Sequence, residues 1–280
     1  MNRKEGKMKV YKTLEVLQKL EDSINTKSPF SLVRFGDGGI KLIHSYFYND
    51  NDQLDQIVEK EGIPRDKIKN LIDLWAMSAT TADFVDTPYV YFSGEFWPRV
   101  KGHKNMSKRT IERLKMWKRI YRIANFDVKN YCNPEVNFLS CLNIFGNKGF
   151  PNILKDKKVC IITSRLDMKK TLAPYITNVD VVNVPGFTYN QYDVFQRVLN
   201  KIKLDSKKYD LWLIAAGELG RIYTGIIKFH GGISFDIGST VDFWATGEIP
   251  VRLSPYVEED YRNKLKIKLT QEGEKYREFL

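Results

Sequence analysis

Hydrophobic and polar positions recur along this chain with two periods, one typical of helices and one typical of strands. In the first part of the chain, the helical period predicts an amphipathic helix over Val10–Ile24 and another that begins at Pro64. The apolar face of the second helix is formed by Ile68, Leu71, Ile72 and Trp75. Short apolar runs at Leu32–Phe35 and Tyr89–Phe92 are typical of strands.

The pattern becomes more regular after a loop at Asn147–Pro151. Four apolar runs predict buried strands, at Val159–Ile162, Val179–Val184, Leu211–Ile214 and Ile233–Asp236. Crossover helices are expected at Tyr192–Ile202 and Leu219–Phe229. Because strands alternate with helices, we predict an α/β fold with a Rossmann-like, doubly wound, mostly parallel sheet flanked by helices. The charged tail Arg262–Leu280 is expected to form a peripheral helix.

The length of 280 residues fits one large domain, which we expect to consist of an N-terminal half (residues 1–150) and a C-terminal half (residues 151–280). Hydrophobic residues at 42% and charged residues at 28% are ordinary for a soluble globular protein. No apolar run approaches the ~20 residues that span a bilayer, and the polar start Met1–Met8 has no signal-peptide core. We therefore expect a cytoplasmic protein, which leaves contact with the inner face of a membrane open.

The cysteines and histidines argue against two kinds of site. Cys132, Cys141 and Cys160 are odd in number and have no CxxC spacing, so neither a disulfide framework nor a zinc knuckle is indicated. The three histidines are scattered singly, which argues against a histidine-rich metal site.

The net charge of +11 is concentrated in one segment, Arg99–Arg122, which holds ten Lys or Arg residues and a single acidic residue, Glu112. Ser107 can cap a helix whose apolar face follows at helical spacing, with the basic side chains on the solvated face. Such a face favours an anionic partner, either a phosphorylated substrate or an anionic membrane surface. A nucleic-acid partner is disfavoured because no helix-turn-helix, RNP-like motif or zinc finger accompanies the segment.

The segment Ser31–Gly39 combines a short apolar run with residues suited to phosphate. Arg34 offers a bidentate fork for phosphate oxygens, and Asp37 can hold a divalent cation that bridges them. The glycines at positions 36, 38 and 39 allow the backbone to approach a ligand closely. A strand end followed by an Asp-Gly turn is the alternative interpretation.

Polar residues also follow three of the predicted strands. These segments are Thr163-Ser164-Arg165, then Ala215-Ala216-Gly217-Glu218-Leu219-Gly220-Arg221, and then Asp236-Ile237-Gly238-Ser239. In a parallel sheet, ligands bind where the carboxyl ends of the strands meet. Gly217 and Gly220 flank the start of a helix, whose free amides favour an anion. The sequence therefore predicts one crevice at which these segments converge.

Together, the Arg34–Gly38, Gly217–Arg221 and Phe235–Ser239 motifs resemble those of the GT-D type glycosyltransferases, over roughly Ser31–Trp244. The resemblance implies a Rossmann-like enzyme that uses a nucleotide-sugar donor. It implies a hexosyl-type transfer to a surface glycan, a glycoprotein or a lipid-linked acceptor.

This chemistry assigns roles to the residues of the three motifs. The donor-binding residues are expected to be Arg34, Gly36, Asp37, Gly38, Ser164, Arg165, Gly217, Leu219, Gly220 and Arg221. Sugar transfer also needs a carboxylate to deprotonate the acceptor hydroxyl. Asp236 is the first candidate for this base and Glu218 the second, and Asp37 completes the candidate catalytic set.

One position departs from the family's pattern. Members carry an acidic residue two positions after the aspartate, whereas this chain has Asp37-Gly38-Gly39. A cation such as Mn²⁺ or Mg²⁺ would then be held by Asp37 with diphosphate oxygens and water. Two alternatives remain open: an arginine clamp that replaces the metal, and a nucleotide- or glycan-binding protein with weakened catalysis.

Two other classes of protein are compatible with parts of the sequence. The Arg99–Arg122 segment would suit a module that binds nucleic acid or an anionic membrane. A Rossmann-type oxidoreductase or methyltransferase is disfavoured, because no complete GxGxxG motif follows the first strand with an acidic residue about 20 positions later.

Overall fold

A computed structural model describes residues 10–11, 13–34, 37–86, 130–132, 153–174, 176–186, 190–246, 248–250 and 268–270 of the chain. The Arg99–Arg122 segment and the expected strand Tyr89–Phe92 lie outside these residues. Within the described part, no helix is long and apolar enough to cross a membrane.

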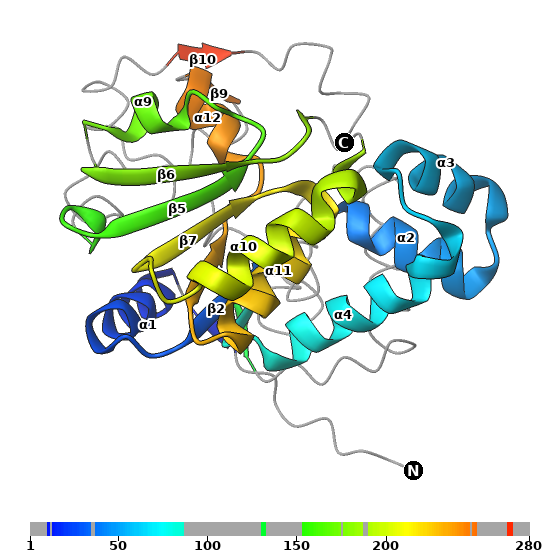
Figure 1. Cartoon of the computed structure of the whole chain (residues 1–280), viewed down its shortest axis with the longest axis horizontal. Helices are drawn as coiled ribbons and strands as arrows, with labels where there is room; N and C mark the ends of the chain where they lie inside the picture. Colours follow the sequence, from blue (N-terminus) through cyan, green and yellow to red (C-terminus); the bar gives the residue numbers. More distant parts are fainter. Residues whose placement is uncertain are drawn as a thin grey trace, which may run out of the picture.

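The fold is built on an eight-stranded sheet with the order β1-β4-β3-β2-β8-β7-β5-β6 (Figure 1). Its strands are β1 (Val10–Tyr11), β2 (Phe30–Arg34), β3 (Phe84–Asp86), β4 (Tyr131–Cys132), β5 (Lys158–Thr163), β6 (Asn178–Asn183), β7 (Leu211–Ala215) and β8 (Ile233–Asp236). All of its neighbouring strands pair in parallel. The prediction of a doubly wound, parallel α/β sheet is confirmed.

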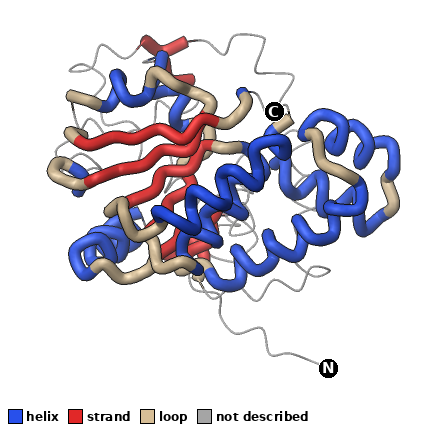
Figure 2. Tube along the Cα trace, viewed as in Figure 1, coloured by secondary structure: helices blue, strands red, loops and turns tan. Residues whose placement is uncertain are grey.

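Helices cover both faces of this sheet (Figure 2). One face packs against α2 (Asp37–Tyr48), α3 (Asn51–Glu61), α4 (Ile68–Thr81), α10 (Phe195–Asp205) and α11 (Gly217–Phe229). The other face packs against α1 (Thr13–Thr26), α9 (Met168–Leu172) and α12 (Thr240–Thr246). The 3-10 helices η1 (Arg65–Lys67) and η5 (Gln191–Val194) precede α4 and α10.

The two apolar cores explain why the central strands are almost continuously hydrophobic. In β5, Cys160 and Ile162 enter the core under α10 and α11, while Val159 and Ile161 enter the core under α1 and α9. All four side chains are fully buried. A parallel strand buried on both faces needs apolar residues at every position, and each large one contributes about 1.5–3 kcal/mol through burial.

Two expectations about the ends of the chain are corrected. The first helix begins at Thr13, because Val10–Tyr11 forms β1, which pairs with β4 at the sheet edge. In the tail, Lys268–Thr270 forms the strand β10, which pairs with β9 (Glu248–Pro250) instead of belonging to a helix. The alternation of lysine with leucine or isoleucine from 264 to 269 has the period of a strand, which accounts for this difference.

Candidate functional site

The topology separates neighbouring loops at the carboxyl edge of the sheet, where the strands end. The chain leaves β2 and β7 toward the helices α2 and α11 on one face, but leaves β5 and β8 toward α9 and α12 on the other. Because these strands are neighbours in the order β2-β8-β7-β5, their loops separate at this edge. Such points of divergence are where ligands bind in open α/β sheets.

Arg34 and Asp236 lie at this carboxyl edge, at the ends of β2 and β8. The backbone N–H of Arg34 donates to Asp236 Oδ2 at 3.3 Å, and the backbone N–H of Gly238 donates to Asp236 Oδ1 at 3.1 Å. Both carboxylate oxygens are therefore engaged by backbone donors. This arrangement brings two of the predicted site residues together.

Asp236 is only 5% exposed. Burial raises the pKa of its carboxyl group to about 6, while the positive charges of Arg221 and Arg34 and the two backbone donors oppose that rise. A carboxyl group with a pKa near neutrality can exchange a proton at physiological pH, as a general base must.

Arg221 projects from α11 beneath the same strand ends. Its Nε donates to the carbonyl oxygen of Arg34 at 2.5 Å, and its Nη1 pairs with Glu218 one turn earlier on the helix. The guanidinium also lies over the ring of Trp75, 5.9 Å from the centroid, and Trp75 Nε1 donates to the Glu218 carbonyl at 3.0 Å. Both charged side chains are largely buried, at 8% and 13% exposed. Glu218 therefore balances most of the charge of Arg221 within the protein.

The start of α11 has the geometry expected of an anion-binding turn. Gly217 has a φ of +50°, a left-handed conformation that favours glycine, and it is exposed. A β-carbon on Gly220 would lie 3.0 Å from Ile214 Cγ2, so glycine allows the helix to approach β7. Leu219 is fully buried in the core, so neither its side chain nor its backbone is exposed for contact with a ligand.

Arg165 follows β5 at the same edge of the sheet. Its Nε and Nη2 both lie 2.9 Å from Asp242 Oδ1 on α12, and the two side chains are 35% and 36% exposed. Ser164 lies beside Gly186, whose β-carbon would be 3.8 Å from Ser164 Oγ. The guanidinium of Arg165 is therefore directed at α12, in contrast to Arg34 and Arg221, which share a hydrogen bond.

The turn after β2 is described only in part. Gly36 lies outside the described residues, and Asp37 and Gly38 form the first turn of α2. The described residues contain no group of three or more His, Cys, Asp or Glu side chains that could hold a metal ion. These residues alone do not form a cage for Mn²⁺ or Mg²⁺.

The structure adds Asp86, which sequence reasoning missed. Asp86 ends β3 and is the register partner of Arg34 on β2. Its Oδ2 lies 3.7 Å from Arg34 Nε, and its side chain is 2% exposed. The apolar pattern predicted a strand at Tyr89–Phe92 and none at Phe84–Asp86. A predicted strand at Phe84–Asp86 would have marked Asp86 as another acidic residue at a strand end.

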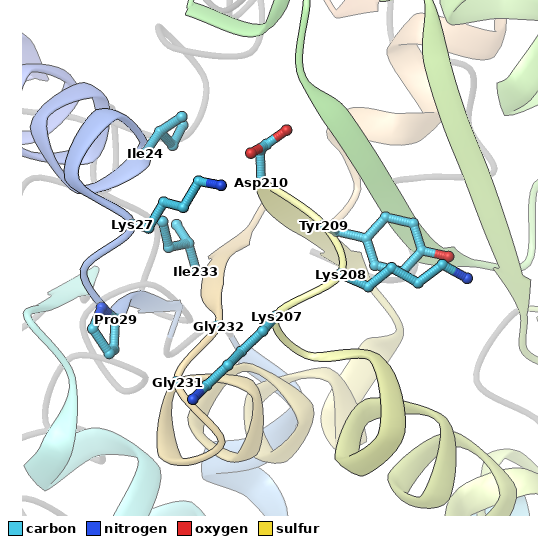
Figure 3. A pocket seen from close by; sticks show the side chains of 10 residues that line it. All are labelled: Ile24, Lys27, Pro29, Lys207, Lys208, Tyr209, Asp210, Gly231, Gly232 and Ile233. Atoms are coloured by element: carbon cyan, nitrogen blue, oxygen red, sulfur yellow. The ribbon is translucent and has the colours of Figure 1, made fainter.

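A separate pocket of about 330 Å³ lies at the amino edge of the sheet, where the strands begin (Figure 3). It lies between the segments that precede β2, β7 and β8, and Lys27, Lys207 and Asp210 are among its lining residues. None of the predicted site residues lines it. The sequence motifs therefore point to the carboxyl edge and not to this pocket.

Comparisons with known proteins agree with this architecture. Three solved structures match, all described as domain of unknown function 1792. A selenomethionine-substituted structure has a TM-score of 0.55 at 17% identity. A structure described as having a distinct glycosyltransferase fold has a TM-score of 0.54 at 18% identity. Each of these two alignments covers 97% of this chain and 94% of the other. A structure described as a new glycosyltransferase from Streptococcus sanguinis has a TM-score of 0.54 at 15% identity, with 95% of both chains covered. These likenesses concern the fold.

A comparison with curated protein sequences found no match. The sequence model described as a GT-D fold-like domain matches residues 11–244, which is most of the chain and includes every strand from β2 to β8. The chain therefore belongs to the GT-D-like family.

Proposed function

We propose that this protein is a glycosyltransferase that moves a sugar, of hexosyl type, from a nucleotide-diphosphate donor to a glycan, glycoprotein or lipid-linked acceptor. The observation that carries the proposal is the hydrogen-bonded group of Arg34, Asp236 and Arg221 at the carboxyl edge. Membership of the GT-D-like family and the glycosyltransferase descriptions of two similar structures support the same function.

The reaction needs stabilisation of the negative charge that develops on the departing diphosphate. Of the three arginines, we assign this role to Arg34, because its side chain is 22% exposed and its backbone N–H is hydrogen-bonded to Asp236. Arg221 is paired closely with Glu218, and its Nε donates a hydrogen bond to the carbonyl oxygen of Arg34. The exposed amides at Gly217 supply a second anion-binding element.

Asp236 is the proposed general base for the acceptor hydroxyl, since burial brings its pKa to about 6. Glu218 is the second candidate and would first have to leave Arg221. The carboxylates of Asp86 and Glu218 already face arginines, and Gly39 replaces the family's second acidic residue. Asp37 with water and diphosphate oxygens remains the proposed site for Mn²⁺ or Mg²⁺.

Binding and turnover distinguish the proposal from its alternatives. A thermal-shift panel of UDP, GDP, ADP, CDP and dTDP should contain one nucleotide that stabilises the fold by about 2.7 kcal/mol at 100 times its Kd. The matching nucleotide sugar should release that diphosphate, and Arg34→Ala should slow the release. Nucleotide binding without release would instead indicate a binding protein with weakened catalysis. Attachment to a membrane through Arg99–Arg122 stays a sequence-based prediction.

A further inference from the structure

Arg34 and Asp86 form an ion pair across two neighbouring strands. They are register partners in the parallel β2–β3 ladder, so their side chains leave the sheet on the same face. Asp86 Oδ2 lies 3.7 Å from Arg34 Nε. With 2% of its side chain exposed against 22% for Arg34, the carboxylate lies deeper than the guanidinium and contacts its inner edge.

Gly238 limits the guanidinium on another side. A β-carbon at this position would overlap Arg34 Nη1 and lie 3.1 Å from Arg34 Cζ. Gly238 has a φ of +50° and also donates its N–H to Asp236. The chain thus uses glycine at the one point where the guanidinium passes the loop after β8.

We propose that Asp86 and Gly238 are positioning residues that fix the guanidinium of Arg34, so that its exposed part meets a diphosphate oxygen of the donor. This inference rests on the proposed glycosyltransferase function. Asp86 contacts Arg34 at Nε, and 22% of the Arg34 side chain is exposed. A guanidinium group that is held in one orientation loses less side-chain entropy on binding phosphate than a mobile guanidinium group does.

The sign of one mutational effect separates positioning from simple electrostatics. Asp86→Asn keeps the size of the side chain and removes its negative charge. Coulomb's law alone predicts that a nucleoside diphosphate then binds more tightly, because a repulsive charge has gone. Positioning predicts weaker binding, because Arg34 has lost the partner that orients it.

Asp83, the residue just before β3, provides a matched control. It lies at the amino edge of the sheet, pairs with Lys228 at 2.8 Å and accepts the backbone N–H of Ser31 at 2.8 Å. Asp83→Asn also removes a carboxylate that pairs with a basic side chain, but at the amino edge of the sheet and not at the carboxyl edge. It should change the melting temperature and leave nucleotide affinity unchanged.

The experiment measures the Kd of the best nucleoside diphosphate of the panel by calorimetry, with the melting temperature of each variant. We expect Asp86→Asn to weaken binding about tenfold, within the range of couplings between contacting residues, and to have no further effect when Arg34 is already alanine. Gly238→Ala, which displaces the guanidinium and changes no charge, should also weaken binding. It provides the same test if Asp86→Asn does not fold.

Three results would overturn the inference. Tighter or unchanged binding in Asp86→Asn, with wild-type binding intact, would reduce Asp86 to a structural counter-ion and leave the proposed function standing. An Asp86→Asn effect that persists in full without Arg34 would do the same. A wild-type protein that binds none of the nucleotides would overturn the proposed function together with this inference.

Discussion

The backbone N–H of Arg34 donates to Asp236 Oδ2 at 3.3 Å, across 202 positions of the sequence. This bond joins the ends of β2 and β8, which are neighbours in the sheet. It therefore links the first motif of the chain to the last one. The candidate site can form only after the two halves of the sheet have paired, so its geometry depends on the complete fold.

Titration of Asp236 should govern the pH dependence of transfer. Burial raises its pKa to about 6, and a general base works in its deprotonated form. kcat/KM should therefore rise with pH and level off above about pH 6, with a loss of about tenfold one pH unit below the pKa. The measurement is release of the nucleoside diphosphate between pH 4.5 and 9, at donor concentrations well below KM.

Glu218→Gln is the control for this assignment, because Glu218 is the other candidate base. If Asp236 is the base, the rising limb remains near pH 6 in Glu218→Gln and activity is lost in Asp236→Asn. If the rise of kcat/KM with pH disappears in Glu218→Gln while Asp236→Asn keeps most of its activity, Glu218 is the general base.

The strands around the site could be predicted because they are buried on both faces. Lys158–Thr163, Leu211–Ala215 and Ile233–Asp236 differ from the predicted runs by one residue or less at each end. A strand buried on both faces is a short apolar run that ends where polar residues begin. The same transition marked Asp236 and the Gly217 turn as residues of the carboxyl edge.

The partners of the charged residues could not be predicted in the same way. Asp242 is 77 positions from Arg165, and Asp86 ends a strand of three residues that has little pattern of its own. A period in the sequence shows which face a side chain occupies, but not which distant residue lies opposite it. Three arginines could therefore be proposed as phosphate ligands by type, while the counter-ions Asp86 and Asp242 emerged only with the fold.

The buried pair of Arg221 and Glu218 should stabilise the fold as a unit. Arg221→Gln leaves Glu218 largely buried without its partner, and we expect it to lower the free energy of unfolding by about 3 kcal/mol. In the Arg221→Gln background, Glu218→Gln should lower the free energy of unfolding by less than it does in the wild-type protein. The difference, which is the coupling energy, should be about 1–3 kcal/mol. Urea unfolding of the four proteins at pH 7 measures the cycle. Additive effects would show that the two residues act independently.

Close packing of α4 against α11 should make Gly225 intolerant of a side chain. A β-carbon there would lie 2.6 Å from Ser78 Cβ and 2.8 Å from Ser78 Cα, so a backbone has to move. We expect Gly225→Ala to lower the free energy of unfolding by about 1–3 kcal/mol, despite the higher helix propensity of alanine. Ser78→Gly should restore part of this loss in the double variant. A Gly225→Ala protein as stable as wild type in urea would contradict the packing.

Restoring the carboxylate that the family pattern has at position 39 should create a stronger cation site. Gly39 lies in the first turn of α2, where the backbone is helical. Gly39→Glu should bind Mn²⁺ roughly tenfold more tightly, because carboxylate ligands set the affinity of such sites. Gly39→Gln is the matched control, since it has the same length and a similar helix propensity without the charge. Calorimetric titration with Mn²⁺ compares the two, and Asp37→Asn in the Gly39→Glu background should remove the gain. Equal affinities in Gly39→Glu and Gly39→Gln would exclude Asp37 and position 39 as a shared metal site.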